Sequence, residues 1–266
     1  MQKSTWTVAD ILTMMAKLRD PEQGCPWDKA QSFETIVPHT LEEAYEVIEA
    51  IESKSWSEIP DELGDLFFQI VFYCQLGQEQ HKFAFQDMLN ALGDKLYRRH
   101  PHVFGAQEKL DSATEVLQRW EQGKVKERAE KAQHSLMDDL PTALPALSLA
   151  QKTQKRAATV GFDWPTVQGV MEKVYEELEE VQDELSAEQV DIDKVRHEIG
   201  DVLFSVVNLA RTVGVDAEQA LRLSQKKFVS RFQHIEKMVK EKEATIDEQD
   251  AETLHAMWLA AKESQR

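Results

Sequence analysis

Glycine and proline are scarce in this sequence, since 10 glycines and 8 prolines stand among 266 residues. An average chain has about 7% glycine and about 5% proline, and β-sandwiches and barrels need these residues at their many turns. Runs in which apolar and polar residues alternate, as in a half-buried strand, are also scarce. These absences exclude most all-β folds and favour helices.

Cysteine is nearly absent and long apolar runs are missing. Cys25 and Cys74 are too few for a disulfide framework and form no Cys-x-x-Cys metal pair, which fits a reducing compartment. The most apolar stretches, residues 66–74 and 202–210, are half the length that a membrane span needs. The first residues include Asp10 and lack the apolar core of a signal peptide. We therefore expect a soluble, cytoplasmic protein with no membrane partner.

Positive charge is in short supply, because 31 lysines and arginines face 48 aspartates and glutamates and give a net charge of −17. A field of that sign repels DNA, RNA and anionic lipid. Apolar residues make up 42% and charged residues 30%, a globular balance that excludes a disordered chain. We therefore expect a folded protein that does not bind nucleic acid.

Apolar residues recur with helical spacing through most of the chain, and this pattern predicts about nine helices. Asp216, with Gln219 three residues later, has the spacing of a helix start. Asp10, directly before Ile11, predicts another start. Helices therefore account for most of the predicted structure.

The helical pattern lapses in one segment, HSLMDDLPTALP. Pro141 and Pro145 interrupt any helix there, because proline lacks a backbone N–H group and clashes with the preceding turn. The lapse predicts two helical domains, at residues 1–135 and 147–266, joined by a linker at 136–146.

The two predicted domains contain an internal repeat. The segment TLEEAYEVIEAIE resembles VYEELEEVQDELS, and DELGDLFFQIVF resembles RHEIGDVLFSVVN, in the same order. The repeat matches four acidic residues of each half, namely Glu43, Glu46, Glu62 and Asp65 with Glu177, Glu180, Glu198 and Asp201. Further matches pair Lys95 and Arg99 with Lys227 and Arg231, and Trp120 and Lys124 with Trp258 and Lys262. A repeat of this extent indicates a duplicated domain.

Four acidic residues of the second half have the spacing of a metal site. They form two pairs at helical spacing on consecutive predicted helices, Glu177 with Glu180 and Glu198 with Asp201. Two antiparallel helices would bring these carboxylates together, and like charges that close repel each other unless cations lie between them. Oxygen ligands select hard ions such as Mg²⁺ or Mn²⁺, which often also bind substrate phosphates. The alternative is a solvated acidic face, but Asp201 and its counterpart Asp65 are each followed by an apolar run, and the pattern occurs twice.

Cationic and amide side chains occur where a phosphate-bearing substrate needs them. Lys173 and Lys194 each precede a carboxylate by four residues, so each lies one turn away on the same helix face. Lys227 and Arg231 share another face, and Asn208 continues the acidic face of its helix. Together these residues resemble a polyphosphate clamp. Ordinary Lys–Glu pairing, about 0.2–0.5 kcal/mol for each pair, is the alternative for the first two lysines.

Other phosphate and metal chemistries find little support. The chain has no Gly-x-x-x-x-Gly-Lys-Ser/Thr loop and no His-Asp doublet. A di-iron bundle needs Glu-x-x-His on two helices, and only Glu252 with His255 fits that pattern. His100 and His102 fit loop packing or capping better than metal binding.

The motifs together resemble one known family. EE-x-x-E followed by E-x-x-D occurs twice, and GCPWDKAQ, RRHPHVF and VGFDW occur elsewhere in the chain. This combination, spanning nearly the whole chain, is similar to the two-domain MazG nucleoside triphosphate pyrophosphohydrolases. The resemblance implies an all-α tandem repeat of MazG-type helical domains, whose four-helix-bundle cores are completed by formation of a homodimer. It also implies Mg²⁺-dependent hydrolysis of nucleoside triphosphates to monophosphate and pyrophosphate, with several bases accepted, a role in nucleotide-pool house-cleaning and a link to the stringent response.

The resemblance also implies roles for individual residues. The family's metal ligands match Glu177, Glu180, Glu198 and Asp201, and its nucleotide contacts match Lys173, Lys194, Lys227, Arg231 and Trp258. Trp258 would stack on any base with little discrimination, the alternative being a tryptophan that closes the core. Glu176 or Glu177 would orient or deprotonate the attacking water. One departure is Ser230, where relatives often carry a second arginine.

The two repeats differ at positions that would face phosphate. In the first half, the counterparts of Lys173, Lys194 and Asn208 are His39, Glu58 and Phe72. We therefore expect the second half to carry most or all of the catalysis. The alternative function, from another class, is a nucleotide-sensing or protein-binding helical scaffold that holds metal without turnover.

Overall fold

The computed structural model describes residues 5–105 and 135–264, with positions 112, 115, 116, 119 and 123 between them. These residues hold eleven α-helices and one 3₁₀ turn and contain no strand, which confirms the all-α fold. More helices are present than the nine expected, because α2 (Pro26–Ala30) and α6 (Pro101–Phe104) are too short to show a helical period. Among the described helices, none is both long and apolar enough to cross a membrane.

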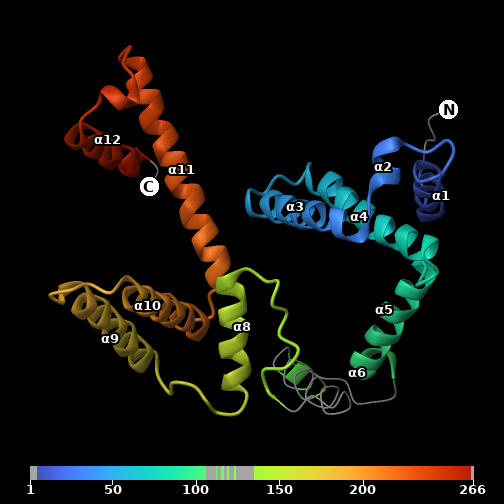
Figure 1. Ribbon diagram of the computed structural model, residues 1–266, viewed down its shortest axis with the longest axis horizontal. Coiled ribbons are helices and arrows are strands. Elements are labelled where there is room, and N and C mark those ends of the chain that lie inside the picture. Colours follow the sequence, from blue (N-terminus) through green and yellow to red (C-terminus); the bar gives the residue numbers. More distant parts are fainter. Residues whose placement is uncertain are drawn as a thin grey trace. The chain divides into compact units, whose positions relative to one another are not determined.

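The chain divides into two compact units, Met1–Val125 and Lys126–Arg266. Each unit is built around two long helices that pack together across a short connection (Figure 1): α3 (Phe33–Glu52) with α4 (Ile59–Glu79), and α9 (Val167–Ser186) with α10 (Ile192–Thr212). Both pairs combine a helix of 20 residues with one of 21, as a duplicated domain predicts. The domain boundary stays a prediction, because most of residues 106–134 lie outside the described part of the chain.

In the N-terminal unit, shorter helices cover the long pair. The helix α1 (Val8–Leu18) packs on α4, and α5 (Phe85–Arg99) contacts α4 at the end of the hairpin. The apolar faces of these helices meet in one core of fully buried side chains: Met15, Ile36, Val71, Phe72 and Leu76. Burial of these side chains is the main source of stability of this unit.

In the C-terminal unit, α8 (Ala146–Ala158) packs on α10 and on the long helix α11 (Ala217–Glu241). Residues 135–145, which precede α8, are not helical. The far end of α11 packs against α12 (Ala251–Ser264), and the 3₁₀ turn Ile246–Glu248 lies between these two helices (Figure 1). A second apolar cluster joins them, formed by the buried residues Ile235, Val239, Met257 and Ala261.

The helix ends confirm one predicted start and correct the other. Asp216 caps α11, because its carboxylate accepts a hydrogen bond of 2.8 Å from the backbone N–H of Gln219. The start predicted at Asp10 is wrong, since α1 begins at Val8 and Thr7 is its N-cap. Asp10 lies inside the first turn, where its carboxylate accepts the backbone N–H of Thr7 at 3.1 Å. An acidic residue can therefore close a cap from within the helix.

We expect substitution of Phe72 to test the N-terminal core. The ring of Phe72 is fully buried, so Phe72→Ala leaves a cavity and should lower the free energy of unfolding by about 3–5 kcal/mol. Urea unfolding followed by circular dichroism measures this loss. Trp56→Ala is the control, because Trp56 is 72% exposed and its removal should cost less than about 0.5 kcal/mol. Equal losses from both substitutions would contradict the assignment of Phe72 to the core.

Candidate functional site

The α9–α10 pair brings three of the predicted metal ligands together. Oxygen atoms of Glu177 and Glu180 on α9 and of Glu198 on α10 lie within 4.8 Å of one another. Glu177 is only 5% exposed, so its carboxylate is held away from bulk water. The spacing of three residues on α9 places both of its glutamates on the face that meets α10. This group is called the C-terminal acidic group below.

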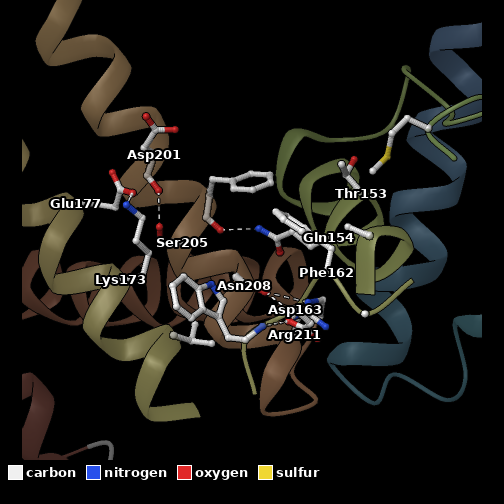
Figure 2. Close-up of a pocket in the computed structure, with 16 residues that line it drawn as sticks. Thr153, Gln154, Phe162, Asp163, Lys173, Glu177, Asp201, Ser205, Asn208 and Arg211 are labelled. Atoms are coloured by element: carbon white, nitrogen blue, oxygen red, sulfur yellow. Dashed lines mark hydrogen bonds and ion pairs between the residues drawn. The ribbon is translucent and has the colours of Figure 1, made fainter. Parts of the chain in front are cut away.

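Asp201, the fourth predicted ligand, lies next to this group. It follows Glu198 by one turn of α10 and borders the same cavity as Glu177 (Figure 2). Its side chain is exposed and is not one of the three that approach within 4.8 Å. The hydroxyl of Ser205, one turn further on, donates to the backbone carbonyl of Asp201 at 2.9 Å. Asp201 therefore stands at the solvent side of the acidic group.

The α3–α4 pair holds a corresponding group in the N-terminal unit. Oxygen atoms of Glu43, Glu62 and Asp65 lie within 4.8 Å of one another. Burial raises the pKa of Glu43, and a hydrogen bond shared with Glu46 raises it further. Burial also raises the pKa of Glu62, with added repulsion from Glu46 and Asp65. The duplicated acidic pattern therefore forms a cluster in both units, although Asp65 belongs to the N-terminal group and its counterpart Asp201 does not belong to the C-terminal one.

Crowding of like charges marks the C-terminal acidic group as well. Burial and a hydrogen bond shared with Glu177 raise the pKa of Glu180, and the charge of Lys173 partly opposes this shift. A raised pKa means that the neighbours disfavour the ionised carboxylate. A divalent cation would relieve the repulsion, and a set of donors made only of oxygen suits a hard ion such as Mg²⁺ or Mn²⁺. The residues of both groups therefore fit a hard divalent ion.

Lys173 lies directly against the acidic group. Its ammonium is 2.8 Å from Glu176 and 2.7 Å from Glu177, and these two contacts raise its pKa. The pairing within one helix considered for this lysine is thus present, and Lys173 also lines the cavity beside the carboxylates (Figure 2). Glu176 differs from Glu177 in being 57% exposed. The lysine remains charged at neutral pH and is placed to donate to an anion in the cavity.

Lys194 does not lie where its sequence spacing predicts. The expected neighbour is Glu198, one turn along α10, but the ammonium lies 3.3 Å from Glu184 near the end of α9. The side chain of Lys194 is 61% exposed, so its long side chain can reach the carboxylate of Glu184 on the neighbouring helix. Spacing on one helix cannot reveal such a partner, because the position of Glu184 depends on how α9 and α10 pack.

A cavity of about 570 Å³ opens beside the acidic group (Figure 2). It lies between α8, α9, α10 and the loop that leads into α9, and Met137 also lines it. Figure 2 shows Lys173, Glu177 and Asp201 on one side of this cavity and Gln154 on the other. Asn208, predicted to continue the acidic face, lines the cavity too.

Asp163 and Arg211 line the cavity but have no role in the sequence predictions. The guanidinium of Arg211 forms an ion pair with Asp163 and donates to Oδ1 of Asn208, at 3.0 Å from Nε. Arg211 holds the pKa of Asp163 below its ordinary value. Asp163 belongs to the VGFDW motif, which was the available signal, whereas its partner 48 residues away has no local signature.

The remaining predicted nucleotide contacts lie on α11 and α12. The guanidinium of Arg231 is 5.8 Å from the ring centroid of Trp258, and the ring of Phe228 is 5.1 Å from it. Trp258 also packs against the buried cluster that joins these two helices. Neither Lys227, Arg231 nor Trp258 lines the cavity beside the acidic group. The structure therefore brings Lys173, Asn208 and the carboxylates together, whereas Lys227, Arg231 and Trp258 lie outside this cavity.

The N-terminal counterparts differ as the sequence predicts. His39, in place of Lys173, lies 3.6 Å from Glu42. Phe72, in place of Asn208, is fully buried in the apolar core. Glu58, in place of Lys194, is the residue before α4. Lys95 and Arg99 lie on α5, whereas Trp120 and Lys124 lie outside the described residues.

Comparison with known proteins assigns the family. A model described as the MazG nucleotide pyrophosphohydrolase domain matches residues 31–104 and 165–236. The nucleoside triphosphate pyrophosphohydrolase of Escherichia coli (strain K12) is 52% identical over 95% of both chains, and the nucleoside triphosphate pyrophosphohydrolase/pyrophosphatase MazG of Thermotoga maritima is 40% identical over 95% of this chain and 94% of its own. The uncharacterized protein YabN of Bacillus subtilis is 38% identical over 96% of this chain and 51% of its own length. Because the two matched segments contain the two helix pairs and their acidic groups, the chain belongs to the MazG nucleotide pyrophosphohydrolase family.

Proposed function

We propose that this chain hydrolyses nucleoside triphosphates to nucleoside monophosphates and pyrophosphate in its C-terminal unit, with Mg²⁺ as cofactor and Mn²⁺ as a substitute. The observation that carries the proposal is the C-terminal acidic group with the ammonium of Lys173 beside it. Two relatives that match nearly the whole chain are named for this activity. The proposed setting is cytoplasmic house-cleaning of the nucleotide pool, with several bases accepted and a link to the stringent response.

Four carboxylates would hold the ion, namely Glu177, Glu180, Glu198 and Asp201. When bound, Mg²⁺ neutralises charge on the triphosphate and lowers the pKa of a water molecule. The carboxylates contribute because their mutual repulsion favours the ion-bound state over the empty one. All four carboxylates come from α9 and α10, so they belong to the same unit of the chain.

Side chains of the protein would bind the phosphates and accept the proton of the attacking water. Lys173 donates to phosphate oxygens, and Asn208 donates from its amide nitrogen on the same cavity wall. Water attacks the α-phosphorus, a new P–O bond forms, and the bond to the bridging oxygen breaks so that pyrophosphate leaves. Glu176 accepts the proton of the attacking water, because its exposed carboxylate can pass that proton to solvent. Glu177, which is buried, would orient the water and serve as one of the ligands of the ion.

We also propose a homodimer as the working form, with no nucleic-acid or membrane partner. Large apolar side chains on the α9–α10 pair are half exposed in the single chain, namely Leu178, Ile199, Leu203, Phe204 and Val206. Soluble monomers rarely leave such a set uncovered. A second copy would cover these side chains and would also allow Lys194, Lys227, Arg231 and Trp258 to act as substrate contacts from α10, α11 and α12.

The products of the reaction test the bond that is cleaved. Purified protein incubated with ATP and Mg²⁺ should form AMP and pyrophosphate in equal amounts, because attack at the α-phosphorus expels the other two phosphates together. EDTA should abolish the reaction and added Mg²⁺ should restore it. Anion-exchange chromatography separates the products. Primary formation of ADP and orthophosphate would contradict the proposal.

The two acidic groups should contribute unequally to turnover. Glu180→Gln or Glu198→Gln removes a proposed ligand beside Lys173 and should lower kcat/KM by roughly 100-fold or more. Glu46→Gln or Glu62→Gln changes the group that has His39 in place of the lysine and should leave most of the activity. The four variants form matched pairs across the repeat, and circular dichroism confirms that each is folded. Equal losses in both halves would show that the N-terminal group also works in catalysis.

The assembly state tests the homodimer. Size-exclusion chromatography with light scattering should give at least twice the chain mass of 30.5 kDa at micromolar concentration. The reason is that association of two copies would bury the half-exposed apolar side chains of α9 and α10. Leu203→Glu puts a charge on that surface and should shift the protein toward the single-chain mass. A wild-type mass of 30.5 kDa would refute the homodimer.

A further inference from the structure

Arg211 connects two other residues at the wall of the cavity beside the acidic group (Figure 2). It lies in the last turn of α10, its side chain is only 14% exposed, and its guanidinium forms an ion pair with Asp163. The carboxylate of Asp163 also accepts the backbone N–H of Trp164 at 2.9 Å, which ties it to the loop between α8 and α9. The guanidinium is therefore held from the side of this loop.

The same guanidinium fixes the side-chain amide of Asn208, three residues earlier on α10. Nε and a terminal nitrogen of Arg211 both donate to Oδ1 of Asn208, at 3.0 and 2.7 Å. A guanidinium can only donate, so the atom that it contacts must be the amide oxygen. Nδ2 lies on the opposite side of the amide, and among the described residues no partner bonds to it. This nitrogen is left to donate to a ligand.

The orientation of this amide decides what the cavity wall offers to a phosphate. Nδ2 is a donor, whereas Oδ1 is an acceptor that repels a phosphate oxygen. On a helix, asparagine has about two common χ1 wells, and the amide can turn over in each, which gives about four states. Without Arg211 the donor would face the phosphate in roughly a quarter of these states, and apparent affinity falls with the competent fraction.

We propose that Arg211 is a positioning residue, which acts through Asn208 by holding Nδ2 toward the phosphates of the substrate. The inference rests on the proposed function, in which Asn208 donates to phosphate. Asp163 and Oδ1 of Asn208 already occupy Nε and one terminal nitrogen of the guanidinium. Arg211 therefore orients the substrate contact and does not form it.

The N-terminal unit lacks this arrangement. Phe72 stands where Asn208 stands, and Gln75, three residues later, stands where Arg211 stands. An arginine does approach Phe72, but it comes from α1: the guanidinium of Arg19 is 5.3 Å from the centroid of the ring. It packs on an apolar ring and has no amide to orient there. The positioning of an amide is therefore specific to the C-terminal unit, to which the catalysis is assigned.

A double-substitution experiment tests whether Arg211 acts through Asn208. Arg211→Met removes the donors and should lower kcat/KM for pyrophosphate release from ATP roughly fivefold, because the competent fraction falls. Asn208→Ala removes the phosphate contact and should lower kcat/KM roughly tenfold, as expected for a hydrogen bond to a charged group. The double variant should also lose roughly tenfold, because Arg211 then has no amide to orient. Independent effects would instead multiply.

The separate kinetic constants distinguish positioning from loss of folded protein. In Arg211→Met, KM should rise while kcat stays within about twofold of wild type, because bound substrate itself selects the correct amide orientation. A partly unfolded preparation shows the opposite, a lower kcat with an unchanged KM. Arg196→Met is the matched control: Arg196 is 70% exposed on α10 and pairs with Asp193 one turn away, so wild-type constants should remain.

A double variant whose loss equals the product of the two single losses overturns the inference, and so does a wild-type KM in Arg211→Met. Failure of the proposed function is seen separately, as absence of pyrophosphate release from ATP by the wild-type chain. In that case the wild type, the two single variants and the double variant are compared by the Kd of inorganic tripolyphosphate with Mg²⁺, measured by calorimetry. The same ratios decide, and absence of tripolyphosphate binding overturns the inference.

Discussion

Repulsion between carboxylates across the α9–α10 pair is the constraint on which the rest of the C-terminal unit depends. Three glutamates whose oxygens lie within 4.8 Å of one another push the two helices apart, and packing must offset this force. Val170 and Val174 on α9 and Val207 on α10 are buried, and burial of apolar side chains on these helices contributes free energy that offsets the repulsion. Lys173, one turn before Glu177 on α9, neutralises part of this charge. The apolar side of each helix thus holds in place an acidic side that is poised to bind a cation.

The two units share one arrangement of long helices but differ in the residues that face their interiors. The long helices are equal in length in both units, and both bring acidic residues together. In the N-terminal unit Phe72 fills the core, so the position contributes to stability through buried apolar area. In the C-terminal unit the matching Asn208 lines a cavity, so that position has a polar group at the cavity wall in place of apolar packing. Divergence at this position alters the interior while the acidic helix faces remain alike.

Much of the fold could be predicted from sequence because helices are local. The helical period and the internal repeat are visible over stretches of about twenty residues, and Asp216 signals a helix start through an interaction with Gln219 in the same turn. The acidic groups were also predictable, because two pairs on adjacent helices converge once the helices pack. Interactions that join distant segments were not: Lys194 pairs with Glu184 through the packing of α9 on α10. The cavity likewise depends on how α8 meets α10, which no periodic pattern encodes.

The net negative charge of the chain limits how this site can attract a nucleoside triphosphate. A nucleoside triphosphate is a polyanion, and a chain of net charge −17 repels it at long range. Attraction would therefore have to be local, through a cation held by the acidic group and through Lys173, which is paired with Glu177. Such charge-based contacts hold any polyphosphate equally and give no information about the base. Gln154 and Asn208 line the same cavity and are uncharged, so they add polar groups to its walls without changing the electrostatic balance of the acidic group.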